Sequence, residues 1–177
     1  AVIGLTLDKT YSQQRFTGGY TKTFTRYEKF TELDRNALDY NAVWEWRLGA
    51  RLSGLLRKDF SETAIGFDDT QNTKLNIRTT KNNIATFDAT LTGGWHLLGG
   101  FYNTSTVTSQ IFFAQPSFNM NTGELGLNYI AGSASTVTFT TRLRRGVNAL
   151  PRGVDFVNVI DTDFTVQEQE LKSTWHV

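Results

Sequence analysis

Cysteine is absent from this chain of 177 residues, and proline occurs only twice. A lack of cysteine fits a protein that crosses an oxidising periplasm without needing disulfides. No run approaches the ~20 consecutive apolar residues of a transmembrane helix, and the mean hydropathy is negative. This argues against a helical membrane protein but leaves a β-barrel open, because the lumen and loops of a barrel are polar. The net charge of +1 gives no hint of a polyanionic partner, so we expect no nucleic acid.

Recognisable catalytic chemistry is also missing. The two histidines, His96 and His176, lie on different predicted strands without metal-ligand spacing. No serine occupies a G-x-S-x-G elbow. The glycine pairs at 93–94 and 99–100 precede no helix and no Lys-Ser/Thr pair, as a phosphate loop would. We therefore expect no catalytic residue, no metal and no cofactor. An outer-membrane enzyme, a third hypothesis, would need a catalytic cluster that this stretch lacks.

The pattern that is present is alternation with a period of two. Over residues 38–48, every second residue is apolar and the residues between are mostly polar, which predicts a β-strand with one apolar and one polar face. The period breaks at Gly49 and Ala50 and resumes over residues 52–56, so the two runs read as an antiparallel hairpin with a very short connection. The apolar positions are Leu38, Tyr40, Ala42, Trp44, Trp46 and Leu48.

The rest of the chain repeats this unit, giving about nine predicted strands. The connections at residues 49–50, 93–94 and 131–134 are tight, and those at 29–36, 65–74, 111–117 and 145–163 are longer, with that at 9–14 intermediate. Tight turns at one end and long loops at the other are the outer-membrane pattern. Residue 1 already lies in an alternating run, and no signal peptide precedes that run. Nine strands is an odd number, whereas bacterial single-chain barrels usually have an even number of strands. We expect residues 1–177 to form a single domain that is part of a longer barrel.

The tryptophans and the charged residues of the polar face are the candidate site residues. Trp44, Trp46 and Trp95 lie near tight turns and Trp175 where the next is due, as an aromatic girdle at the lipid headgroups requires; the core of a sandwich would also explain their alternation. The charged residues would line a lumen and offer hydrogen bonds to a glycan, or form a ladder of cross-strand ion pairs. They are Asp39, Glu45, Arg47, Arg51, Arg57, Asp59, Asp88, Glu124, Arg142, Arg144, Glu168 and Glu170.

Four stretches carry a family resemblance: LDKTYSQQRFTGGY (7–20), LDYNAVWEWRLGARLSG (38–54), GGWHLLGGF (93–101) and DTDFTVQEQELKSTW (161–175). In these the chain resembles the EpsL-type outer-membrane β-barrels of bacterial exopolysaccharide biosynthesis loci, a porin-like group whose members are roughly twice as long as this chain. The resemblance implies location and fold more firmly than activity. It implies outer-membrane lipid and polysaccharide as partners, with other secretion-system components or further copies of the chain.

Together these features predict an all-β protein. It would be an antiparallel up-and-down transmembrane β-barrel, a partial barrel of about nine strands, in a bacterial outer membrane. It would act as a non-enzymatic conduit for secreted exopolysaccharide. The alternative is a soluble or filament-forming β-sandwich that binds carbohydrate or builds an extracellular matrix. The apolar face distinguishes them, because exposed to lipid it makes the purified protein require detergent, and buried between two sheets it does not.

Overall fold

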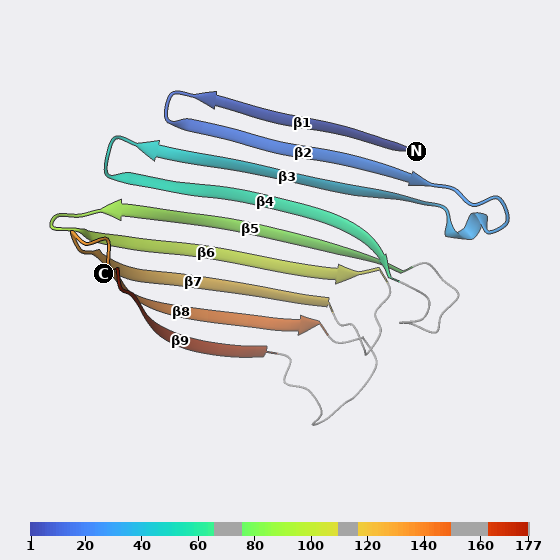
Figure 1. The fold of residues 1–177 in the computed structure, drawn as a ribbon. Helices are drawn as coiled ribbons and strands as arrows, with labels where there is room; N and C mark the ends of the chain where they lie inside the picture. Colours follow the sequence, from blue (N-terminus) through green and yellow to red (C-terminus); the bar gives the residue numbers. More distant parts are fainter. Residues whose placement is uncertain (66–75, 110–116, 150–162, 177) are drawn as a thin grey trace.

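The computed structural model describes residues 1–65, 76–109, 117–149 and 163–176. In these ranges the chain forms nine strands in a single sheet, and each strand pairs antiparallel with the next in sequence (Figure 1). The strands are β1 Val2–Tyr11, β2 Gln14–Thr25, β3 Arg35–Leu48, β4 Leu52–Ile65, β5 Asn76–Thr90, β6 Trp95–Thr108, β7 Ser117–Ile130, β8 Thr136–Ala149 and β9 Asp163–Thr174. The all-β, up-and-down part of the prediction is confirmed.

Strand register decides which side chains share a face, because directly paired residues of neighbouring strands point to the same side of the sheet. The apolar face carries Phe16, Trp44, Leu56, Ala85 and Phe101, which are in register across β2 to β6. The opposite, polar face carries the alternate residues. Large exposed hydrophobic side chains lie mainly on the apolar face. The alternation therefore produces a sheet with one apolar face, and no other part of the described chain covers that face.

The turns at one end of the sheet are all tight. Gly93 and Gly94 both have positive φ, and Trp95 N donates to Thr92 O at 3.4 Å, as in a two-residue type I′ turn. The prediction of an intermediate connection at residues 9–14 is wrong, because β1 runs on to Tyr11 and β2 begins at Gln14. Pairing with β2 holds this polar segment in the sheet.

Three further boundaries differ from the prediction. The strand expected to fade from residue 103 continues as β6 to Thr108, and β8 runs to Ala149 although an irregular stretch was expected from residue 145. A short 3-10 helix, η1 Thr31–Leu33, lies inside the predicted loop at 29–36. The other predicted long loops lie largely outside the described residues, at 66–75, 110–116 and 150–162.

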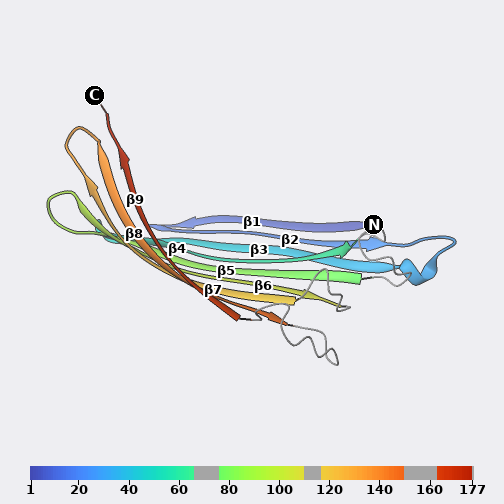
Figure 2. The same cartoon turned by 90° about the horizontal axis from the view of Figure 1, so that it is seen from below.

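The sheet curls but does not close into a barrel. Figure 2 shows β8 and β9 turning steeply away from the flatter strands β1 to β4. Within the described residues, β1 pairs only with β2 and β9 only with β8. The buried polar residues are Asn76, Thr108, Thr122, Ser135 and Thr140, and all except Ser135 of the β7–β8 turn belong to the polar face. Polar-face side chains are thus the sheltered ones, as on the inner side of a curled sheet.

Across the part of the chain that is described, no helix combines the length and apolar character needed to span a membrane.

Candidate functional site

The polar face of β7 to β9 holds a cluster of charged side chains. Arg142 of β8 donates through Nε to Glu124 of β7, and through Nη1 to Glu170 Oε2 of β9 at 2.8 Å. Arg144 Nη2 lies 3.0 Å from Glu168 Oε2, which bridges the same two strands. All five of these residues were predicted, and they form cross-strand ion pairs. This is the ladder of ion pairs that the sequence offered as the alternative to free lumen charges, and it stabilises strand register.

A second polar cluster joins β5 to β6 near the tight turns. His96 Nδ1 lies 2.8 Å from Asp88 Oδ1 and 3.5 Å from Thr90 Oγ1. The predicted residue Asp88 is thus within hydrogen-bonding distance of His96, which the sequence analysis considered only as a metal ligand. The imidazole–carboxylate contact fixes the two side chains relative to one another.

The third group pairs within or beside the first strands. Arg57 Nε contacts both carboxylate oxygens of Asp59 at 3.0 and 2.8 Å, two residues along the same strand. Arg15 makes a two-point contact with Asp8, at 3.2 and 2.9 Å. The Asp8–Arg15 pair was missed because residues 9–14 were read as a loop, so its two members were not placed on one face. The corrected boundaries of β1 and β2 supply that signal.

Four predicted residues have no ion pair among the described residues: Asp39, Glu45 and Arg47 on the polar face of β3, and Arg51 in the β3–β4 turn. Glu45 lies directly across from Arg15 in register. Glu45 and Arg47 line a hollow with Thr10, Ser12 and Ser53 at the tight-turn end of the sheet. Hydroxyl, carboxylate and guanidinium groups side by side are the hydrogen-bonding partners that a polyhydroxylated ligand uses.

No metal site accompanies these clusters. Within residues 1–65, 76–109, 117–149 and 163–176, no three His, Cys, Asp or Glu side chains are arranged to hold an ion. The arrangement offers hydrogen bonds and charge, and it assembles no recognisable catalytic group.

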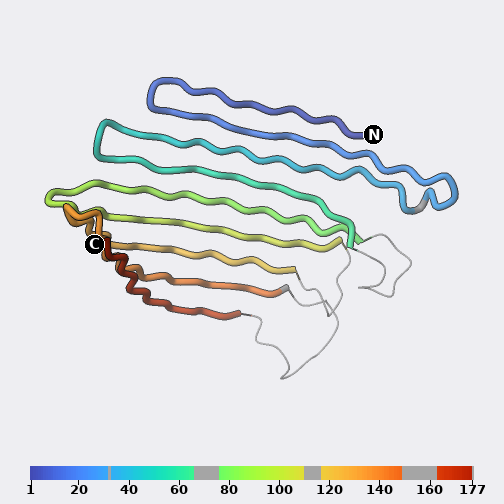
Figure 3. The backbone as a smooth tube through the Cα atoms, in the orientation of Figure 1, coloured from blue at the N-terminus to red at the C-terminus, as the bar shows by residue number. Residues whose placement is uncertain are grey.

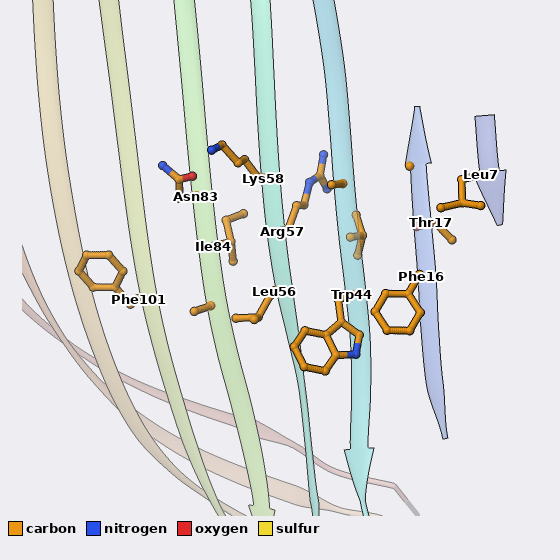
Figure 4. A pocket seen from close by; sticks show the side chains of 14 residues that line it. Leu7, Phe16, Thr17, Trp44, Leu56, Arg57, Lys58, Asn83, Ile84 and Phe101 are labelled. Atoms are coloured by element: carbon orange, nitrogen blue, oxygen red, sulfur yellow. The ribbon is translucent and has the colours of Figure 1, made fainter. Parts of the chain in front are cut away.

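The predicted girdle residues lie on the apolar side. Trp44 stacks on Phe16 with ring centroids 5.7 Å apart, and its indole Nε1 donates to Gln14 Oε1 at 2.8 Å. Trp95 packs against Tyr129 at 4.9 Å. Trp44 lines a shallow groove with Phe16, Leu56 and Phe101 (Figure 4). An indole ring whose N–H is hydrogen-bonded and whose remaining surface is apolar suits the boundary between an aqueous and an apolar environment.

Rows of directly paired residues run across the sheet and allow positions on different strands to be compared. The amide row, as we call it, passes through Ala42, Lys58, Asn83, Asn103, Asn121 and Arg145. The next apolar-face row toward the tight turns, the Trp44 row, passes through Lys9, Phe16, Trp44, Leu56, Ala85, Phe101, Gly123 and Leu143. On β4 to β8 the amide row is polar and the Trp44 row apolar.

The apolar belt, as we call the apolar side chains of this face, shifts along the strands from β1 to β4. On β1 Ile3, Leu5 and Leu7 lie on the long-connection side of Lys9. On β4 Leu52 and Leu56 lie on the tight-turn side of Lys58, with Phe60 on its other side. Relative to the rows, the belt thus reaches further toward the tight turns on β4.

The tight turns move in the same direction. Figure 3 traces how the first three lie progressively further to one side. In register, the turn midpoints advance by about one residue per strand from the β1–β2 turn to the β7–β8 turn. With about 3.3 Å per residue and about 4.8 Å between strands, the inclination is roughly 35°. Strands of closed barrels tilt by about 35–45° against the barrel axis.

Comparison with known proteins gives no relative: no protein-family model, no curated protein and no solved structure matches the chain.

Proposed function

We propose that this chain forms wall strands of a transmembrane β-barrel in a bacterial outer membrane, and that the barrel is a non-enzymatic conduit for exopolysaccharide, as in the EpsL-type proteins it resembles. The observation that carries the proposal is the line of tight turns, which is inclined at roughly 35° to the rows of paired residues. Tight turns level with one membrane surface on strands so inclined are what a bilayer imposes on a barrel wall. Trp46 and Trp95 lie on the tight-turn side of the Trp44 row.

The competing sandwich is disfavoured by the amide row. On β4 and β5 this row lies near the middle of the strands, at Lys58 and Asn83. A second sheet packed along these strands would cover a lysine, an arginine and a line of amides. Burying a charge without a partner is costly, of the order of several kcal/mol. In a barrel the same half of each strand projects beyond the bilayer into water.

The polar face supports the conduit. Its ion pairs neutralise one another, so that the lumen wall carries no large excess of positive or negative charge. A long neutral or acidic glycan can then form hydrogen bonds to hydroxyl, amide and carboxylate groups without being held by strong electrostatic attraction. Asp39, Glu45, Arg47 and Arg51 remain available for direct contacts. Flow through the barrel is passive, with energy supplied elsewhere.

The first test is fractionation of the full chain expressed in a Gram-negative host. The expected product sediments with outer membranes, needs detergent for extraction, and migrates differently on a gel with and without heating. A product that is soluble without detergent would end the conduit proposal and favour the sandwich.

The second test asks whether the polar face lines the pore. Arg142→Glu with Arg144→Glu is expected to shift the ion selectivity of channels in planar bilayers toward cations. The matched pair Glu168→Gln with Glu170→Gln, on the neighbouring strand, is expected to shift it toward anions. Selectivity that stays unchanged in both variants would refute the lumen assignment.

A further inference from the structure

Seven charged residues of the strands lie on the apolar face. They are Lys9, Lys22, Lys58, Glu62, Lys81, Arg145 and Asp163. All except Lys9 lie on the long-connection side of the Trp44 row. Cations outnumber carboxylates there, so this side of the apolar face is positively charged.

Among the described residues the cations on this side of the apolar face have no carboxylate partner, whereas Arg15, Arg57, Arg142 and Arg144 of the polar face each have one. We call Lys22, Lys58, Lys81 and Arg145 the basic rim. Every ion pair between described strand residues joins polar-face side chains, and none includes a rim residue. The Lys22 and Lys81 ammonium groups lie over the rings of Phe24 and Phe60, at 5.2 and 5.9 Å from the centroids.

The nearest rim carboxylate is engaged elsewhere. Glu62 Oε2 accepts a hydrogen bond from the backbone N–H of Leu38 at 3.0 Å. Lys58, Lys81 and Arg145 are exposed at their positions. Their charge is therefore directed outward from the apolar face and not into the sheet.

A line of amides fills the space between Lys58 and Arg145. Asn83 Nδ2 donates to Asn103 Oδ1 at 3.1 Å, and Asn103 Nδ2 donates to Asn121 Oδ1 at 2.8 Å. In register the row reads lysine, asparagine, asparagine, asparagine, arginine, and Figure 4 shows Lys58 next to Asn83 above the apolar groove. The ladder fixes the amides in one plane across β5 to β7, with a cation at each end about 19 Å apart at ~4.8 Å per strand.

We infer that the basic rim and the amide row bind the phosphate groups of lipid headgroups in the leaflet on the long-connection side. This inference rests on the proposed membrane-spanning barrel. A cation at the edge of an apolar belt sits level with the headgroups, and its aliphatic stem packs on the belt while its charge reaches the phosphates. Amide N–H groups between the cations donate to the same oxygens. The opposite face carries the lumen, so the glycan does not compete for this surface.

The test measures lipid preference in vesicles. The full chain is reconstituted in phosphatidylcholine vesicles containing either brominated phosphatidylcholine or brominated phosphatidic acid, and quenching of tryptophan fluorescence reports which lipid contacts the belt. Trp44 lies one apolar-face row from Lys58 and serves as the nearest reporter. The wild-type chain is expected to favour phosphatidic acid.

Two variants with matched charge separate the rim from net charge. Lys58→Gln with Lys81→Gln and Arg145→Gln is expected to lower the preference for phosphatidic acid by about five- to tenfold. Arg47→Gln with Arg51→Gln and Lys172→Gln removes the same charge from the polar side and is expected to leave the preference unchanged. Lys58→Arg with Lys81→Arg retains the charge and is expected to keep the preference.

The outcomes are distinguishable from failure of the proposed function. A chain that inserts and shows heat-modifiable migration, but whose rim variant keeps the wild-type lipid preference, overturns the rim and leaves the barrel intact. Equal loss in the rim variant and in its polar-side control also overturns the rim, because the effect is then one of net charge. A chain that does not insert into either vesicle overturns both.

Discussion

The pair formed by Arg142 and Glu124 provides a quantitative test of the idea that the polar face is sheltered. The perturbation is a double-mutant cycle with Arg142→Ala, Glu124→Ala and the combined variant. The two side chains are 28% and 19% exposed, and the contact joins β7 to β8. Because Arg142 also donates to Glu170 at 2.8 Å, removing Glu124 leaves the guanidinium with one partner, and the cycle isolates the coupling of the first pair.

The magnitude follows from burial. A hydrogen bond to a charged group contributes about 1.5–3 kcal/mol where it is shielded, and an exposed ion pair about 0.2–1 kcal/mol. With most of both side chains covered but the polar face open to water, we expect a coupling free energy of about 1–2 kcal/mol. The control pair is Arg15 with Asp8, which has the same chemistry and a two-point contact but side chains 49% and 60% exposed. Its coupling is expected to fall within experimental error.

The assay is urea unfolding of the reconstituted full chain, followed by tryptophan fluorescence, for all members of both cycles. A larger coupling for Arg142 and Glu124 than for the control pair is the expected result. Equal couplings would refute the reasoning, because they would mean that the polar side of β7 to β9 is no more sheltered than the edge hairpin at β1 and β2.

Two further pairs of substitutions probe the apolar face. A Cβ at Gly99 would overlap the Phe87 ring, whereas one at Gly123 meets nothing within 4 Å. Gly99→Val is therefore expected to lower the free energy of unfolding by about 2 kcal/mol, and Gly123→Val to change it little. Equal effects of both in urea unfolding would contradict this packing. Leu127→Arg puts a charge on the belt and is expected to cost about 2–4 kcal/mol of insertion free energy, while its neighbour Asn128→Arg, on the polar face, is expected to be tolerated in the same vesicle-folding assay; tolerance of both would refute the lipid-facing assignment.

Local pattern predicted the strands where apolar and polar residues contrast. Trp44 and Trp46 against Glu45 and Arg47 define a face without any knowledge of neighbours, because the strand period is two. The turn at Gly93 and Gly94 follows from their tolerance of positive φ. In such places the sequence alone placed each candidate side chain on the correct face.

The strand segments that the sequence did not predict lack a contrast between apolar and polar residues. The end of β6 is a run of Asn, Thr and Ser with a single valine, so its alternation carries no signal, and pairing with β5 and β7 holds it extended. The same applies to residues 9–11, where polar side chains continue the sheet because β2 pairs with them. Which carboxylate an arginine meets is likewise a matter of register between strands: Arg142 bridges Glu124 and Glu170 from strands on both sides.

The most informative charged residues are those that interrupt the apolar pattern of the sequence. Lys9, Lys22 and Lys58 each occupy a position where the alternation along the strand would place an apolar residue. Register relates them, because Lys9 ends the apolar run of β1 and Lys58 lies between Leu56 and Phe60 on β4, although the two lysines occupy adjacent rows. A periodic pattern cannot contain that information, since tilt is a relation between strands and exists only once they are paired. The same relation places the basic rim on the long-connection side of the Trp44 row and Trp46 and Trp95 on its tight-turn side, so lipid preference and strand tilt are two tests of one geometry.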